Sequence, residues 1–427
     1  MPEPSPRARR VTAKRPAWLT APVLTVAALS IGSGLSAFGV TAVMGDVAAT
    51  FGEAGPGDEV ADQLGLTATT LGIALSIIRL ASLGSLPAAA LADRYGRRGV
   101  LLLVAGVGFG LTALAALAPT FWVYVALVTL ARPGLSTINV LAGVIAAEET
   151  TSKDRSAAIA LMTAAYGLGA GLVSVGRGVL PGEPSWRLVT GFALVPLLLL
   201  PLLARRIREP AIAAAHHRTT GLPGAVPRPL APRVALLAVL AGSIAIATGP
   251  GFTYLFIYGE GILDASPLFL SALVLAAGPA GLVGLLLGRA AADHLGRRIA
   301  AGTAMALTGI AVAYGYGGTT RDLAIGYLAT IVASSAFAPP AGALAAELVP
   351  TAIRATVAGW LTVAGVLAAV LGLTAFGVLA DLTGGFASAS RTLGAVVAII
   401  ALGFWWLPET RGVELESLED DEADPVP

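Results

Sequence analysis

The sequence predicts an all-α integral membrane protein with twelve transmembrane helices in two pseudo-symmetric six-helix bundles. Three observations predict this fold. Apolar residues make up 56% of the 427 residues and charged residues only 12%, against roughly 25% charged residues in a typical soluble domain. Twelve apolar stretches are long enough to cross a bilayer. A charged loop motif recurs 200 residues further along the chain.

Composition also limits the chemistry. The mean hydropathy is +0.81, so most of the surface must face lipid, and the net charge of +1 argues against nucleic acid as a partner. The chain has no cysteine, which excludes disulfides, thiolate metal ligands and cysteine nucleophiles. The three histidines, His216, His217 and His294, fall in polar segments. We therefore expect no metal site and no cofactor.

The first predicted element is a basic cytoplasmic N-terminus, residues 1–17, which carries Arg7, Arg9, Arg10, Lys14 and Arg15. A signal peptide can begin with such a segment. However, the apolar run from Leu19 to Val43 is too long for a signal-peptide core and has no clear A-x-A cleavage pattern. We interpret this run as the first membrane span.

The twelve spans must be helices, because lipid offers no hydrogen-bond partner to an open backbone. Glycine and alanine are abundant inside them, as close helix packing in membranes favours. The predicted spans are 18–43, 68–92, 99–118, 121–147, 156–180, 186–204, 233–259, 266–291, 298–316, 322–346, 355–380 and 389–407.

Lysine and arginine are unevenly distributed between the two sides of these spans. They gather in the loops that share a side with the N-terminus, whereas the loop from Gly45 to Thr67 on the other side has five acidic residues and no basic one. The positive-inside rule therefore predicts that both termini are cytoplasmic and that the protein lies in a cell (inner) membrane. The predicted domains are a bundle at 18–204, a basic cytoplasmic loop at 205–232, a bundle at 233–407 and an acidic tail at 408–427.

An internal repeat relates the two bundles. The sequence Asp-Arg-Tyr-Gly-Arg-Arg at 93–98 recurs as Asp-His-Leu-Gly-Arg-Arg at 293–298. After span 4, Glu148 is followed seven residues later by Arg155. After span 10, Glu347 is followed by Arg354 at the same spacing. Both motifs recur about 200 residues further along the chain, which indicates a duplicated six-helix unit. Both copies lie in cytoplasmic loops, so the halves are parallel repeats about an axis along the membrane normal.

These motifs resemble the major facilitator superfamily. The loop at 93–98 matches the signature loop of that family, except that Ala89 replaces the usual glycine four residues before Asp93. Trp186-Arg187 before span 6 is also typical, and Pro408-Glu409-Thr410-Arg411-Gly412 resembles the ending of sugar and organic-acid porters. The resemblance covers about residues 18–412. It implies a secondary transporter that works by alternating access and is not an enzyme.

The loop motifs are predicted to form a cytoplasmic gate. Asp93 ends span 2, where a carboxylate can accept hydrogen bonds from a neighbouring helix N-terminus, and the resemblance implies that this neighbour is span 11. Gly96 allows a tight turn, and Arg97 can pair with Glu148. The alternative is that these arginines only obey the positive-inside rule. The predicted gate comprises Asp93, Arg94, Gly96, Arg97, Arg98, Glu148, Arg155, Asp293, Gly296, Arg297, Arg298, Glu347 and Arg354.

A charge near mid-membrane needs a partner or a function. Arg132 lies roughly 17 Å into span 4 at 1.5 Å per residue, close to the middle of a core about 30 Å thick. We predict that Arg132 lines a central cavity and holds an anionic group. The alternative is a structural arginine bonded to carbonyls freed by a kink at Pro133.

Five further residues are candidates for the same cavity. Arg79 lies roughly 21 Å from the cytoplasmic end of span 2, although its side chain can also snorkel outward. The resemblance implies that spans 1, 4, 7 and 10 line the cavity, and each aromatic candidate has ordinary packing as its alternative. The predicted substrate-binding set is Arg132, Asn139, Arg79, Tyr166, Tyr254 and Tyr258.

Two missing patterns narrow the function. No Asp or Glu lies near mid-membrane, so no proton carrier can be named, and span 5 lacks the Gly-Pro-x-x-Gly-Gly pattern of drug antiporters. We expect a monomeric transporter in a lipid bilayer for an organic anion or a sugar-like metabolite, coupled to protons. The alternatives are a multidrug or metabolite efflux antiporter, a transceptor without transport, and a membrane enzyme.

Overall fold

The computed structural model describes residues 19–52, 60–151, 154–179, 185–207, 226–350 and 353–411. Every regular element in these ranges is a helix. The predicted basic N-terminus, most of the central loop and most of the acidic tail lie outside the described residues.

The first six spans form one bundle. α1 (Ala21–Phe51) is followed by the short helix α2 (Val60–Leu64). The second span consists of α3 (Ala68–Ala81), η1 (Ser82–Gly84) and α4 (Ser85–Tyr95). The remaining elements of this half are α5 (Arg97–Ala115), α6 (Phe121–Glu148), α7 (Arg155–Val179), α8 (Trp186–Gly191) and α9 (Leu194–Ala204), the last two forming the sixth span.

The other six spans form the second bundle. Its seventh span consists of α10 (Ala231–Thr253) and α11 (Leu255–Gly261), which meet at Tyr254, four residues after Pro250. The remaining elements are α12 (Pro267–Leu295), α13 (Arg297–Gly315), α14 (Thr320–Glu347), α15 (Arg354–Thr383), α16 (Phe386–Ala401) and η3 (Leu402–Trp406).

The described helices confirm the predicted membrane fold. Eleven spans are long and apolar enough to cross a bilayer by length and composition. The remaining span is α13, which begins with Arg297 and Arg298 and packs between α14 and α16. Large apolar side chains point away from the bundles, as a lipid-facing surface requires, and Leu198 and Leu286 are 75% and 68% exposed.

Hydroxyl side chains begin several of these helices. The hydroxyls of Thr20, Thr67 and Thr120 each accept a hydrogen bond from the backbone N–H three residues later, which satisfies one of the open donors of a helix start. α6 continues through Pro133. The carbonyl of Pro133 accepts a 2.7 Å hydrogen bond from the hydroxyl of Thr137.

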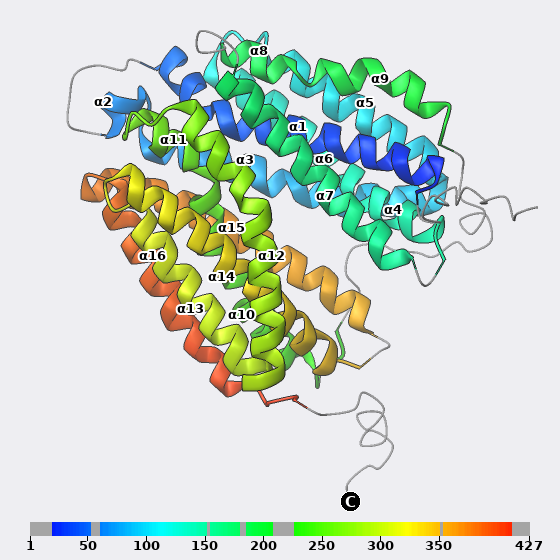
Figure 1. Ribbon diagram of the computed structural model, residues 1–427, viewed down its shortest axis with the longest axis vertical. Coiled ribbons are helices and arrows are strands. Elements are labelled where there is room, and N and C mark those ends of the chain that lie inside the picture. Colours follow the sequence, from blue (N-terminus) through cyan, green and yellow to red (C-terminus); the bar gives the residue numbers. More distant parts are fainter. Residues whose placement is uncertain are drawn as a thin grey trace, which may run out of the picture.

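The two halves meet at one end of the molecule and diverge toward the other (Figure 1). α3 packs against α15, α7 against α12 and α1 against α11. We name the end that carries α2 and α11 the closed end. The end that carries the loops at 93–98 and 293–298 is the motif end.

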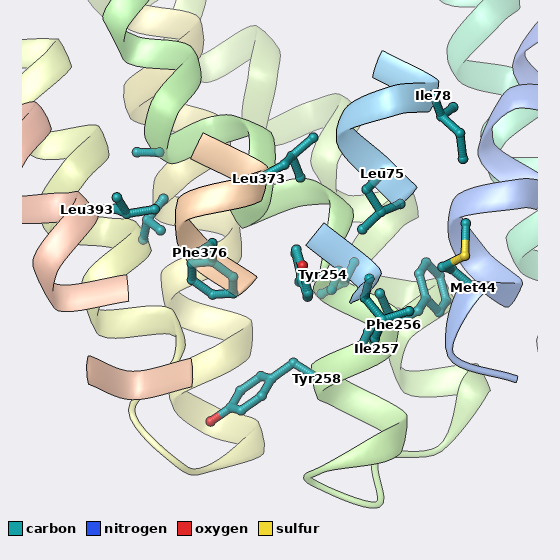
Figure 2. Close-up of a cluster of buried hydrophobic side chains, with 14 of the residues drawn as sticks. Met44, Leu75, Ile78, Tyr254, Phe256, Ile257, Tyr258, Leu373, Phe376 and Leu393 are labelled. Atoms are coloured by element: carbon teal, nitrogen blue, oxygen red, sulfur yellow. The ribbon is translucent and has the colours of Figure 1, made fainter. Parts of the chain in front are cut away.

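Small residues bring α3 and α15 together near the closed end. A Cβ on Gly377 of α15 would lie 2.2 Å from the carbonyl oxygen of Ala68, and one on Gly72 would lie 2.6 Å from that of Leu373. Such close backbone approach needs glycine. Apolar side chains of both halves continue the interface beyond this contact, including Leu75 of α3 and Phe256 of α11 (Figure 2).

Candidate functional site

A cavity of about 370 Å³ lies between the two halves. Four helices of the first half, α1, α3, α6 and α7, line it together with α10 and α15 of the second half. The volume is in the range that holds a small organic ligand, roughly 300–1,000 Å³. The position between two repeats is also where transporters of this architecture bind their substrates.

Three of the predicted binding residues line this cavity. Arg79 comes from α3, Arg132 from α6 and Tyr166 from α7. The two guanidinium groups carry like charge and repel each other electrostatically. The fold therefore gathers two positive charges from helices that are separate in sequence.

Neither guanidinium is paired within the part of the chain that the structure describes. No hydrogen bond or ion pair joins the Arg79 or Arg132 side chain to a described residue, and the Nε of Arg132 is buried without a partner. The alternative that Arg132 binds carbonyls freed at Pro133 therefore has no such bond to support it. Both residues are partly buried, so the cavity holds two positive charges that no described lining residue neutralises.

The remaining cavity wall is neutral. Thr41 of α1 and Thr248 and Thr253 of α10 supply hydroxyl groups, and Phe38 and Phe252 supply aromatic surface. No acidic side chain is among the described lining residues. The first half thus contributes both charges, and the second half contributes hydroxyl and apolar surface.

Three other predicted binding residues lie outside this lining. The amide nitrogen of Asn139 donates to the hydroxyl of Ser33 at 3.0 Å, so Asn139 faces α1 inside the first half. Tyr254 and Tyr258 pack in an aromatic cluster with Phe376 of α15 and its neighbours (Figure 2). Their part in substrate binding stays a prediction.

The first copy of the gate motif forms a compact ion cluster. Arg97 pairs with Asp93 one turn earlier at 3.3 Å and also with Glu148 at the end of α6. Gly96 has φ 97°, a left-handed value that favours glycine, so the predicted tight turn is confirmed. Arg155 donates to the carbonyl of Ala147, which ties the start of α7 to the end of α6.

The second copy repeats this arrangement in the other half. Arg297 lies 3.9 Å from Asp293 and 3.6 Å from Glu347. Gly296 again has φ 97°. Arg354 donates to the carbonyl of Val349 at 3.4 Å. The sequence repeat is therefore also a repeat of side-chain contacts.

The last arginine of each motif joins the first three helices of its half to the sixth. Arg98 donates to the carbonyl of Ala204 at the end of α9 and to that of Ile207 just after it, and Arg298 donates to the carbonyl of Leu407 after η3. Arg94 instead lies on the surface, with its guanidinium 5.3 Å from the Tyr95 ring centroid. These contacts hold each half together as a unit at the motif end.

Sequence reasoning missed the role of Glu409 in the Pro-Glu-Thr-Arg-Gly motif. Its carboxylate accepts hydrogen bonds from the backbone N–H groups of Arg297 and Arg298 at 2.8 and 3.4 Å. Glu409 thus caps the first turn of α13. The motif itself was the available signal, because a glutamate soon after an apolar span can reach the start of a neighbouring helix.

At the closed end, hydrogen bonds join the two halves. The carboxylate of Asp381 on α15 accepts from the backbone N–H groups of Ala68 and Thr69 at 2.9 and 2.8 Å, which caps α3. Ser76 of α3 is 2.8 Å from the hydroxyl of Thr374 on α15. The sequence predicts that Asp93 contacts the start of span 11 at the motif end. The contact of Asp381 with the start of α3 is of the same kind, at the closed end.

A buried arginine also lies at the closed end, and sequence reasoning did not single it out. Arg177 of α7 is only 5% exposed and pairs with Asp46 of α1 and Glu260 of α11, each at 2.5 Å. Its guanidinium also donates to the carbonyl of Ala42. No sequence pattern links these residues, because their contact depends on how the helices pack.

Comparisons with known proteins agree with this architecture. The family model described as "Major Facilitator Superfamily" matches residues 24–291, and the model "Sugar (and other) transporter" matches residues 233–421. Among curated proteins, none matches the chain.

Solved structures share the fold over nearly their whole length. The inward-open conformation of the xylose transporter XylE from E. coli is 18% identical, with 93% of this chain and 99% of that chain covered and a TM-score of 0.69. A D-xylose-proton symporter is 19% identical, with 92% and 98% covered and a TM-score of 0.66. A bacterial homologue of the human lysosomal transporter Spinster, inward-facing and occupied, is 15% identical, with 90% and 95% covered and a TM-score of 0.67.

The family models, the repeated loop motifs and the cavity between two six-helix halves lead to one conclusion. This chain belongs to the Major Facilitator Superfamily, and it is a multi-pass membrane transporter rather than an enzyme.

Proposed function

We propose that this protein is a proton-coupled secondary transporter of a small organic anion. The observation that carries the proposal is the pair of unpaired guanidinium groups, Arg79 and Arg132, in a cavity whose described lining has no acidic residue. Placing a cation away from water without a partner is costly. A carboxylate or phosphate group that binds both arginines removes that cost and gains charge-assisted hydrogen bonds.

The shape of the cavity limits the rest of the substrate. Its neutral wall, with Thr248 and Thr253 on one side and Phe38 and Phe252 around it, suits a body that carries hydroxyl groups or short apolar segments. We infer a compact, hydroxylated or aliphatic anion. A neutral sugar-like metabolite is the second candidate, because residues 233–421 match the sugar transporter model.

Transport requires the cavity to open on alternate sides. We propose that the bundles 18–204 and 233–407 rock against each other, and that the closed end is extracellular. The excess of lysine and arginine at the motif end supports this orientation, with both termini in the cytoplasm of a cell (inner) membrane and a monomer as the working unit. In this account the gate residues seal the motif end when the closed end opens.

Proton coupling is proposed on two grounds. One similar solved structure is a D-xylose-proton symporter, and an anion that enters a negatively charged cell needs a driving force. Since no acidic residue is among the described residues that line the cavity, the proton acceptor must lie elsewhere in the chain. The alternative, a multidrug or metabolite efflux antiporter, would favour an apolar or acidic cavity, whereas this cavity carries positive charge.

Uptake into proteoliposomes tests the proposal. A panel of labelled carboxylates, sugars and cationic drugs would be measured with and without an imposed pH gradient. We expect gradient-driven accumulation of a carboxylate. Losing a charge-assisted hydrogen bond costs roughly 1.5–3 kcal/mol, so Arg132→Ala and Arg79→Ala would each weaken apparent affinity by roughly ten- to a hundredfold.

Matched variants separate charge from folding. Arg132→Lys keeps the charge and would retain part of the affinity. Arg321→Ala removes an exposed arginine outside the cavity lining and would leave the affinity for the carboxylate unchanged. Proton-driven expulsion of drugs, with carboxylates ignored, would overturn the proposal in favour of efflux.

A further inference from the structure

We propose that Glu260 is a proton-binding site that controls opening of the closed end. It belongs to the Arg177 cluster, which we define as Arg177, Asp46 and Glu260. The inference rests on the proposed orientation and on alternating access, and it supplies the proton acceptor that the cavity lacks.

The Arg177 cluster joins the two halves through a single guanidinium. Arg177 and Asp46 belong to the first half and Glu260 to the second, and one nitrogen, Nη2, is 2.5 Å from a carboxylate oxygen of each acid. The guanidinium also lies 5.5 Å from the ring centroid of Phe256 on α11. The cluster is therefore an ion pair across the interface that must separate when this end opens.

The cluster lies directly above the cavity. Phe38 lines the cavity and packs edge-on against Phe256, with ring centroids 5.9 Å apart. Arg177 covers the same Phe256 ring. The two aromatic rings thus separate the cavity from the ion cluster, so movement of Glu260 away from Arg177 would also open the route from this end to the cavity.

Opening has unequal consequences for the two carboxylates. Asp46 would remain beside Arg177, because both are carried by the first half. Glu260 would leave with the second half and lose this cation, although its side chain is only 18% exposed. Separating a buried charge from its partner is strongly unfavourable, and protonation of Glu260 removes the charge. Proton uptake by Glu260 therefore favours the open closed end.

The other charged and titratable groups on the helices around α11 do not take over the role of Arg177 beside Glu260. α2 carries Asp62, α14 carries Arg321 and Asp322, and α11 itself and its following loop carry Tyr258 and Asp264. α10 and α12, which also pack against α11, bring no charged side chain to the closed end. Arg321, Asp322, Tyr258 and Asp264 belong to the same half as Glu260 and move with it, so their interaction with it changes little on opening.

Asp381 is the other carboxylate that bonds across the interface described above. It accepts from backbone N–H groups at the start of α3, and its residue is exposed. Water can replace those bonds when the halves separate, which makes its protonation less dependent on opening. Asp381 is nevertheless the main competing site, and the experiment below distinguishes it from Glu260.

The proposal can be tested by a distance measurement that needs no substrate. The chain has no cysteine, so Leu117→Cys and Leu382→Cys place one spin label in each half at the closed end, at positions that are 74% and 77% exposed. Electron–electron distance distributions of the full chain in lipid nanodiscs would be recorded at about pH 7.5 and at about pH 4, just below the ordinary pKa of a glutamate, about 4.3.

We expect the ratio of long to short distances to rise severalfold on acidification, because loss of an opposite charge within about 4–6 Å raises the proton affinity of a carboxylate by a factor of ten or more, so the lower pH protonates the open form preferentially. Glu260→Gln would show the long distances already at neutral pH, without further response. Asp322→Asn, which removes an acid of the same half outside the cluster, would respond like the parent.

Three results would overturn the proposal: no change of the parent with pH, a full response in Glu260→Gln, or a response abolished by Asp381→Asn alone. If Glu260→Gln does not fold, Glu260→Asp replaces it and would have to alter the pH midpoint. Because no substrate is present, failure here leaves the anion proposal intact. A pH-responsive protein that transports no anion would refute only the proposed substrate.

Discussion

Arg79 and Arg132 set the electrostatics of the central cavity. Each is the only charged residue in the middle of its helix, and neither has a partner among the described residues. By contrast, four arginines of the gate motifs have oxygen partners nearby, for example Asp93 and Glu148 for Arg97; they are Arg97, Arg98, Arg297 and Arg298. The difference separates two roles for one residue type: paired arginines hold helix ends together, and we propose that the unpaired arginines of the cavity bind an anion.

At the same scale, Asp93 and Asp293 offer a comparison within one chain. Asp93 is 17% exposed and lies 3.3 Å from Arg97, whereas Asp293 is 58% exposed and lies 3.9 Å from Arg297. Exposed ion pairs contribute little. We predict that Asp93→Asn lowers the transport rate severalfold at unchanged surface expression, and that Asp293→Asn has a smaller effect. The measurement is the initial uptake rate, normalised to the amount of protein at the cell surface. Equal rates in Asp93→Asn and the parent would contradict a role of Asp93 in the gate.

At the scale of helices, the contact between α3 and α15 holds the closed end together. It combines close backbone approach at Gly72 and Gly377 with the Asp381 cap and the hydroxyl pair of Ser76 and Thr374. Because these contacts depend on short interhelical distances, a small increase in side-chain size loosens the whole contact.

Two glycines of α15 test this directly. A Cβ on Gly377 would lie 2.2 Å from the Ala68 carbonyl oxygen, whereas nothing lies within 4 Å of one on Gly365. We predict that Gly377→Ala lowers the thermal stability of the detergent-solubilised protein and increases opening of the closed end. Gly365→Ala would be neutral or stabilising, because alanine is favoured over glycine in a helix by about 1 kcal/mol. Equal melting temperatures for the two variants would contradict this account of the interface.

At the scale of the whole molecule, the sequence predicts the spans and the repeat well, because hydropathy and motif spacing are local properties. For example, α6 runs over Phe121–Glu148 where 121–147 was predicted. The site is harder to predict. The sequence of a helix that is apolar all round does not reveal which face meets the cavity. The charge of Arg132 was enough to assign it to the cavity. The residue types of Asn139, Tyr254 and Tyr258 were not enough, because a polar or aromatic side chain can equally pack against a neighbouring helix. The Arg177 cluster joins residues from three helices in both halves, and no local pattern encodes that packing.

The central claim, that the two unpaired arginines of the cavity select an anion, is tested most directly by two probes that differ mainly in charge. Uptake of labelled gluconate and labelled glucose would be compared in the same proteoliposomes, with Arg79→Ala/Arg132→Ala as the reference. The account predicts saturable uptake of gluconate or another hydroxylated carboxylate that the double variant loses, and little uptake of glucose. Saturable glucose uptake that survives in the double variant, with every carboxylate excluded, would contradict it.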